Sequence, residues 1–140
     1  LVALAGGVLA GGRSQATPQA MAALIAEIAA GREIKKGKVT LDLPPLIDNG
    51  NAVPMTVTVD SPMSERDYVK TIHVVNEKNP QPHVIVCHLG PRSGRAAFST
   101  RIKLADAQTV TAIAEMSDGT LWMDSASVIV TLAACLEDIL

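Results

Sequence analysis

Cys135 is the residue of this sequence best suited to covalent chemistry. It lies five residues before the end of the 140-residue sequence and directly follows the β-like run 128–132 with only two alanines between. Chain termini are usually solvated and mobile, so a thiol there is not expected to pack in a core. We therefore expect Cys135 to be an attachment point for a covalent ligand. The alternative is an exposed residue that only forms an intermolecular disulfide.

The residues after Cys135 bear on how readily it reacts. The thiolate is the nucleophilic form of cysteine, and a free cysteine has a pKa of about 8.5. Glu137 and Asp138 follow closely, and no basic residue is near in the sequence. Nearby negative charge disfavours the thiolate. We therefore expect the Cys135 thiol to react slowly unless a partner supplies positive charge.

Cys87, the only other cysteine, is predicted to have a structural role. It lies in residues 83–89, an apolar run in which a cysteine usually acts as a small buried hydrophobic residue. We expect this apolar run to be a strand covered on both faces. A disulfide between Cys87 and Cys135 is not expected, because one is in mid-strand and the other near the end of the sequence. The two cysteines also lack the CxxC spacing of a zinc site.

A copper site is the first metal centre to consider. A blue-copper centre needs two histidines, a cysteine and an axial methionine that converge on one ion. Cys87 and His88 with Met116 or Met123 have the right residue types. Successive residues of a strand point to opposite faces, so Cys87 and His88 cannot both face one ion. We expect no metal site and no cofactor.

Three arginines near a predicted loop are candidates for binding an anion. We expect Arg92, Arg95 and Arg101 to form a small basic patch that assists the docking of an anionic substrate. The alternative is a solvated loop with scattered charges. The whole sequence has 12 basic and 14 acidic residues, a formal net charge of −2. This balance argues against a general nucleic-acid-binding protein, which needs a concentrated basic face.

The elements that must position these residues are mostly strands. Thr17 and Pro18 are a good N-cap and first residue for a short helix, which Gly31 is expected to end. After Gly37 the apolar period changes from 3.6 to 2. Turn residues such as Asp118-Gly119 separate the apolar runs. The predicted strands are residues 39–43, 53–59, 68–76, 83–89, 96–104, 108–116 and 128–132.

This pattern predicts an all-β fold, an immunoglobulin-like β-sandwich of about seven strands with a short N-terminal helix outside it. Hydrophobic residues make up 48% of the sequence but aromatic residues only 2%, so the core must be aliphatic. A chain of 140 residues is long enough for one domain with a real core.

The first residues resemble a targeting segment. Residues 1–12 are small and apolar, as in the hydrophobic part of a secretory signal, and residues 14–16 resemble a cleavage site. The run is shorter than the ~20 residues that span a bilayer. An ordinary apolar helix is the alternative. We expect a signal remnant, a helix with linker, a sandwich domain and a cysteine-bearing arm, at residues 1–16, 17–36, 37–132 and 133–140.

Several short segments follow one another in a distinctive order between about residues 37 and 135. They are Asn49-Gly50-Asn51-Ala52-Val53-Pro54, Asp60-Ser61-Pro62-Met63, Lys78-Asn79-Pro80-Gln81-Pro82, Leu89-Gly90-Pro91, Gly94-Arg95-Ala96, Ser99-Thr100-Arg101-Ile102-Lys103-Leu104-Ala105, Gln108-Thr109-Val110, Ser117-Asp118-Gly119 and Trp122. In this order and spacing they resemble the SoxY family, the carrier subunit of periplasmic thiosulfate oxidation.

The resemblance implies a secreted, non-catalytic carrier, often exported folded by the twin-arginine route to the periplasm. It implies an immunoglobulin-like sandwich bound to a second β-subunit, SoxZ, and transient contacts with haem-containing, hydrolase and dehydrogenase Sox components. The family cysteine, which holds sulfur intermediates covalently on a C-terminal arm, aligns with Cys135. Neither nucleic acid nor membrane is an implied partner.

The arm departs from the family pattern Gly-Gly-Cys-Gly-Gly. Ala133 and Ala134 precede the cysteine, and Leu136 and Glu137 follow it. Glycine adopts positive φ without strain and passes through narrow channels, whereas these residues are stiffer or bulkier. A secreted interaction module with a degenerate arm is therefore the alternative function.

A small metal or redox protein is a third possibility. Lys78-Asn79-Pro80 followed by His83 is similar to iron-containing superoxide reductases, which have a similar sandwich. Those enzymes use four histidines and one cysteine, whereas this sequence has three histidines in all. The ligand count therefore argues against this function.

Overall fold

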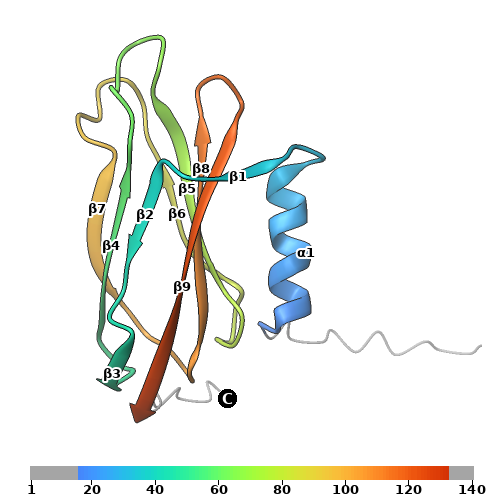
Figure 1. Ribbon diagram of the computed structural model, residues 1–140, viewed down its shortest axis with the longest axis vertical. Helices are drawn as coiled ribbons and strands as arrows, with labels where there is room; N and C mark the ends of the chain where they lie inside the picture. The colour runs from blue at the N-terminus through green and yellow to red at the C-terminus, as the bar shows by residue number, and fades with distance from the viewer. Residues whose placement is uncertain (1–15, 133–140) are drawn as a thin grey trace, which may run out of the picture.

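Two β-sheets packed face to face form the body of the protein, with one helix outside them (Figure 1). The computed structural model describes residues 16–132. The elements in chain order are α1 (Pro18–Ala29), β1 (Ile34–Lys36), β2 (Val39–Asp42), β3 (Leu46–Asn49), β4 (Val53–Val59), β5 (Val69–Asn76), β6 (His83–His88), β7 (Ala97–Ile102), β8 (Gln108–Met116) and β9 (Leu121–Leu132). The predicted all-β class and immunoglobulin-like sandwich are confirmed.

The two sheets have a simple order that leaves one side of the sandwich open. The larger sheet runs β1-β9-β8-β5-β6, with β3 also paired to β9, and the smaller sheet runs β2-β4-β7. β6 and β7 are therefore the last strands of their sheets. They follow one another in the chain, and the side of the sandwich between them has no further strand among the described residues.

The core is aliphatic because strand residues alternate between the two faces. Along β4, Val53, Met55, Val57 and Val59 are buried while the residues between them are more exposed. Buried side chains of both sheets form one cluster made almost entirely of valine, leucine, isoleucine, methionine and alanine. The expected aliphatic core is thus confirmed.

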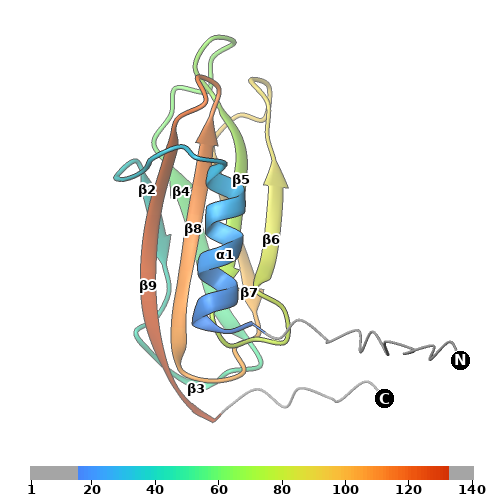
Figure 2. The same cartoon turned by 90° about the vertical axis from the view of Figure 1, so that its right-hand side faces the viewer.

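Helix α1 covers part of the outer face of the larger sheet, across β8 and β5 in Figure 2. Thr17 caps it as predicted, and its hydroxyl accepts a hydrogen bond from the Ala20 amide at 3.0 Å. The left-handed residue that ends the helix is Ala30, one residue earlier than the expected Gly31, which also has positive φ. Ala29 packs with Ile113 and Leu121 in a second apolar cluster beneath the helix.

Three features of the strands differ from the prediction. β1 and β3 were not expected, and both pair in parallel with β9. β9 begins at Leu121, so it has 12 residues and is much longer than the expected 128–132. β6 is not covered on both faces: it is an edge strand in which no residue is fully buried, and Val86 is 40% exposed.

Candidate functional site

The end of β9 is the described point nearest in the chain to Cys135, which itself lies outside the described residues. The Gly50 N–H donates to the Leu132 carbonyl at 2.9 Å, and the Leu104 N–H donates to the Gly50 carbonyl at 2.8 Å. Nearby, the Thr131 hydroxyl donates to the Asp48 carbonyl at 3.2 Å. Leu132 is thus fastened at one end of the sandwich, beside the connection from β7 to β8.

A groove lies on the open side of the sandwich at this same end. Its volume is about 510 Å³, and it runs between the start of β6 and the end of β7. The lining residues include His83, Arg101 and Lys103. The lining contains no aspartate or glutamate. Such a groove favours an anion over a cation.

Asn79 lies in the wall of this groove and joins the turn after β5 to the segment after β7. Its side-chain amide donates to the Lys103 carbonyl at 2.7 Å, and its side-chain oxygen accepts from the Ala105 amide at 3.0 Å. The same oxygen accepts from the Gln108 side chain at 2.9 Å. The side-chain oxygen of buried Asn76 accepts a hydrogen bond from the Asn79 backbone N–H at 2.9 Å. The turn after β5 is therefore tied to the segment after β7.

This role of Asn79 and Gln108 was missed by the sequence analysis. The segment Lys78-Asn79-Pro80 indicates only a resemblance to two families. The signal available in the sequence was the pair of amide side chains next to expected strand ends. Their partners are backbone groups far away in the sequence, which no local pattern reveals.

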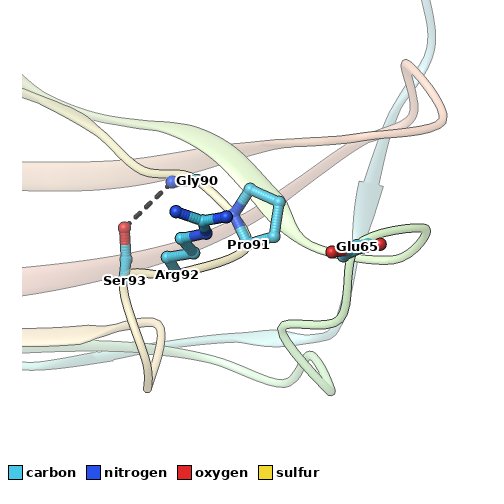
Figure 3. A pocket seen from close by; sticks show the side chains of 5 residues that line it. All are labelled: Glu65, Gly90, Pro91, Arg92 and Ser93. Atoms are coloured by element: carbon cyan, nitrogen blue, oxygen red, sulfur yellow. Dashed lines mark hydrogen bonds between the residues drawn. The ribbon is translucent and has the colours of Figure 1, made fainter.

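A second hollow lies at the opposite end of the sandwich (Figure 3). It has a volume of about 380 Å³, and it is lined by Glu65 and residues 90–93, which include Arg92. The Gly90 N–H donates to the Ser93 hydroxyl at 2.9 Å, which closes the loop. Glu65, from the loop between β4 and β5, puts a carboxylate in this hollow, so it is not a purely cationic site.

The three candidate arginines fall into two groups. Arg92 and Arg95 lie in the loop before β7, at the end of the sandwich where Thr58 pairs with Ala97. Arg101 pairs with Pro54 near the far end of β7. The extended strand from Ala97 to Arg101 alone spans about 13 Å, and Arg95 lies before its start. The structure therefore does not bring the three arginines together, and only Arg101 lies at the end that carries Leu132.

The histidines lie on or beside the β5–β6 pair. His73 Nδ1 and His83 Nε2 are 3.3 Å apart, and the two rings stack with centroids 5.4 Å apart. Partial burial lowers the pKa of His73, and the neighbouring charge of His83 lowers it further. Glu115 acts in the opposite direction, and His88 lowers the pKa slightly. The neutral form of His73 is therefore favoured.

The described residues do not contain a metal-binding cluster of three or more His, Cys, Asp or Glu side chains. Cys87 is half-buried and packs against the core, whereas its neighbour His88 is exposed. The opposite directions expected for this pair are thus observed. Cys87 is a free thiol in a packing role, although it is less buried than expected.

The comparison with protein families decides the identity of the fold. A family model described as "Sulfur oxidation protein SoxY" matches residues 25–135, most of the chain. The chain belongs to the SoxY family. The SoxY match ends at Cys135 itself. No curated protein sequence matches the chain.

Solved structures agree with the SoxY assignment. The sulfur carrier protein SoxY from Chlorobium limicola f thiosulfatophilum superposes with a TM-score of 0.67 at 22% identity, covering 81% of this chain and 98% of that chain. A superoxide reductase (neelaredoxin) from Ignicoccus hospitalis has a TM-score of 0.60 at 14% identity, covering 83% and 94%. A putative superoxide reductase from Thermotoga maritima has a TM-score of 0.57 at 18% identity, covering 71% and 88%. At these identities the likeness concerns the fold alone.

Among the described residues, no helix is long and apolar enough to cross a bilayer.

Proposed function

We propose that this SoxY protein is a non-catalytic sulfur carrier that holds thiosulfate-derived intermediates on Cys135 in the periplasm. The observation that carries the proposal is the family match, which runs through the whole sandwich and includes Cys135. The fastening of Leu132 supports it, because the thiol is tethered three residues beyond a fixed point. Such a tether reaches at most ~10 Å.

The loading step needs an electron acceptor. The Cys135 thiolate and thiosulfate form a sulfur–sulfur bond and give an S-thiosulfonate, with the release of two electrons. These two electrons would pass to a haem-containing Sox partner. A hydrolase partner then adds water across the terminal sulfur–sulfur bond, which releases sulfate and two protons and leaves a persulfide on Cys135. The carrier itself needs no cofactor for these steps.

The partners follow from the same family assignment. A SoxZ-like subunit would bind the sandwich, and the haem-containing, hydrolase and dehydrogenase components would bind transiently at the arm. Export by the twin-arginine route would deliver the folded carrier to the periplasm. The alternative, a secreted interaction module with a non-carrying arm, would keep the sandwich and the SoxZ-like partner.

Intact mass of the protein from thiosulfate-grown cells tests the proposal. We expect a sulfur adduct on the wild-type chain that is absent from Cys135→Ser, together with loss of thiosulfate oxidation in the Cys135→Ser strain. The matched control is Cys87→Ser, which removes the other thiol and should keep the adduct. Unmodified wild-type thiol with normal thiosulfate turnover in the Cys135→Ser strain would favour the interaction module instead.

A further inference from the structure

The groove between β6 and β7 has the charge and the position of a binding site for an anion on the protein's own arm. We propose that Arg101 and Lys103 receive the sulfonate group of the Cys135 S-thiosulfonate and hold the loaded arm against the sandwich. This inference rests on the proposed carrier function, which it extends by naming the resting place of the adduct. The ligand class is a singly charged sulfur oxoanion.

The charge of the groove is the first argument. Arg101 and Lys103 form no ion pair within the described residues, whereas the neighbouring Lys78 pairs with Asp106 at 3.6 Å. A second nearby carboxylate, Glu77, already accepts a hydrogen bond from the Thr109 amide at 2.6 Å. The groove of about 510 Å³ thus has two cationic residues and no acidic residue in its lining. Its positive potential favours the binding of an anion.

Reach is the second argument. Leu104 and Leu132 both hydrogen-bond to Gly50, at 2.8 and 2.9 Å. The Leu104 nitrogen and the Leu132 oxygen are therefore no more than ~10 Å apart, since only one residue lies between the two bonds. Lys103 precedes Leu104 directly. A tether of three residues, itself ~10 Å long, plus the adduct and the long lysine side chain spans this distance.

The other cationic group fails this test of reach. Arg95 lies before the start of β7, and the strand from Ala97 to Arg101 alone is about 13 Å long. Arg92 shares its hollow with Glu65, whose carboxylate would repel the adduct. Of the arginines singled out from the sequence, Arg101 alone is thus close enough and free of an acidic neighbour in its groove.

The groove is also held in shape, which a docking site requires. Asn79 fixes the Lys103 carbonyl at 2.7 Å, and its oxygen fixes the Ala105 amide at 3.0 Å. These bonds order the backbone on either side of Leu104 before any ligand arrives. A preorganised site loses less conformational freedom on binding.

Amide chemical shifts of the chemically loaded protein provide the test. All proteins carry Cys87→Ala, so that Cys135 is the only thiol. The Cys135 thiolate attacks tetrathionate and takes up one half of it to give the S-thiosulfonate. The other half leaves as thiosulfate, so atoms and charge balance. We expect loading to shift amides of residues 83–85 and 100–103. Arg101→Gln/Lys103→Gln should reduce these shifts by at least half, and 0.5 M salt should also reduce them.

The matched control is Arg92→Gln/Arg95→Gln, which removes the same charge at the opposite end and should leave the shifts unchanged. The inference would be overturned if loading shifted only the amide resonances next to Gly50 and Leu132. Equal effects of the two double variants on the shifts would overturn it as well. Shifts that vanish on tenfold dilution would also overturn it, because they would come from the arm of a second copy.

A free anion is the last comparison. Thiosulfate added to Cys135→Ser should shift the same amide resonances, but only at millimolar concentration. The short tether of the loaded protein supplies an effective anion concentration in that range, which the free anion has to match. Thiosulfate that shifts other amides instead would count against the groove.

The outcome is separate from that of the carrier proposal. The adduct is installed in vitro, so docking in the groove without any adduct in cells would defeat the carrier function alone. An adduct in cells without groove shifts in the loaded protein would defeat only this inference.

Discussion

At the scale of single residues, we expect His73 to make the stability of the protein sensitive to mild acid. The rings are 3.3 Å apart at their facing nitrogens, and burial keeps the pKa of His73 below its ordinary value near 6.5. In the unfolded chain His73 binds a proton at a higher pH than in the folded protein. Stability contributed by neutral His73 is therefore present above about pH 6.5 and is lost as the pH falls from there toward its lower folded pKa.

His73→Gln is expected to make stability less dependent on pH. The variant should lose less unfolding free energy than the wild type between pH 7.5 and pH 5.5, because no proton has to enter a half-buried ring. Urea denaturation at the two pH values measures this. His88→Gln is the control, since His88 is exposed and has the smallest effect on the pKa of His73. An equal pH dependence in wild type and His73→Gln would contradict the prediction.

Residue identity alone predicted some single-residue roles and not others. The N-cap role of Thr17 was confirmed because a cap depends on residues three positions away. The opposite directions of Cys87 and His88 followed from strand geometry. The joining role of Asn79 depends on partners more than 20 residues away, such as Lys103 and Ala105, so no local pattern contained it.

At the scale of elements, Arg32 fastens helix α1 to the β8–β9 hairpin. Its guanidinium donates to the carbonyls of Ile28 and Ala29 at 3.2 and 2.9 Å, at the helix end where carbonyls lack intrahelical partners. The Ala29 carbonyl also accepts from the Arg32 backbone N–H at 2.9 Å. It also donates to the Gly119 carbonyl at 3.0 Å and lies 3.3 Å from Glu115. One side chain thus caps the helix and joins it to the sheet.

Arg32→Met should lower the unfolding free energy by about 1–2 kcal/mol, since it removes several partly exposed charged hydrogen bonds. Urea denaturation at neutral pH measures the loss. Arg66→Met is a matched control, because the Arg66 side chain makes no ion pair or hydrogen bond within residues 16–132. An equally large loss of unfolding free energy in Arg66→Met would contradict the prediction, because it would show that removal of any positive charge destabilises the protein.

Regular strands could be predicted from the sequence, whereas short parallel ones could not. β4 shows a clear alternation from Val53 to Val59, and it has the predicted bounds. β1 and β3 have three and four residues, too few to show a period, and they exist because β9 offers them a partner. The apolar β6 looked like a central strand, but its place at the edge is a property of the topology.

At the scale of the whole molecule, the fold resembles that of superoxide reductases. The superoxide reductase structures superpose on most of the chain, yet the described residues hold no cluster of three or more potential ligands. We expect protein produced in iron-rich medium to contain less than ~0.1 iron per chain, since a stable site needs a convergent ligand set. Elemental analysis by mass spectrometry checks this.

His73→Ala/His83→Ala serves as the control for the iron measurement. One iron per chain in the wild type that is lost in this double variant would contradict the prediction and would place a metal on the outer face of the sheet. Iron that stays in both proteins would point to ligands elsewhere in the chain.

The arrangement of the two ends of the sandwich was the part least accessible from sequence. Arg92, Arg95 and Arg101 are close in the sequence, so they were expected in one patch. An extended strand carries its residues apart at about 3.3 Å each, and β7 places Arg101 at the opposite end from the other two. Family resemblance suggested a role for Cys135, but only the topology shows which charges share the end of the molecule that carries Leu132.

The length and pairing of β9 have a mechanical consequence for any partner that draws on the arm. Hydrogen bonds to β8, β1 and β3 lie across the strand along most of its 12 residues, and the last of them holds Leu132 to Gly50 at 2.9 Å. A pull along the strand from beyond Leu132 loads these bonds in shear, all together, instead of peeling them one by one. Under the proposed carrier function, a partner enzyme that pulls on Cys135 would therefore leave the sandwich intact.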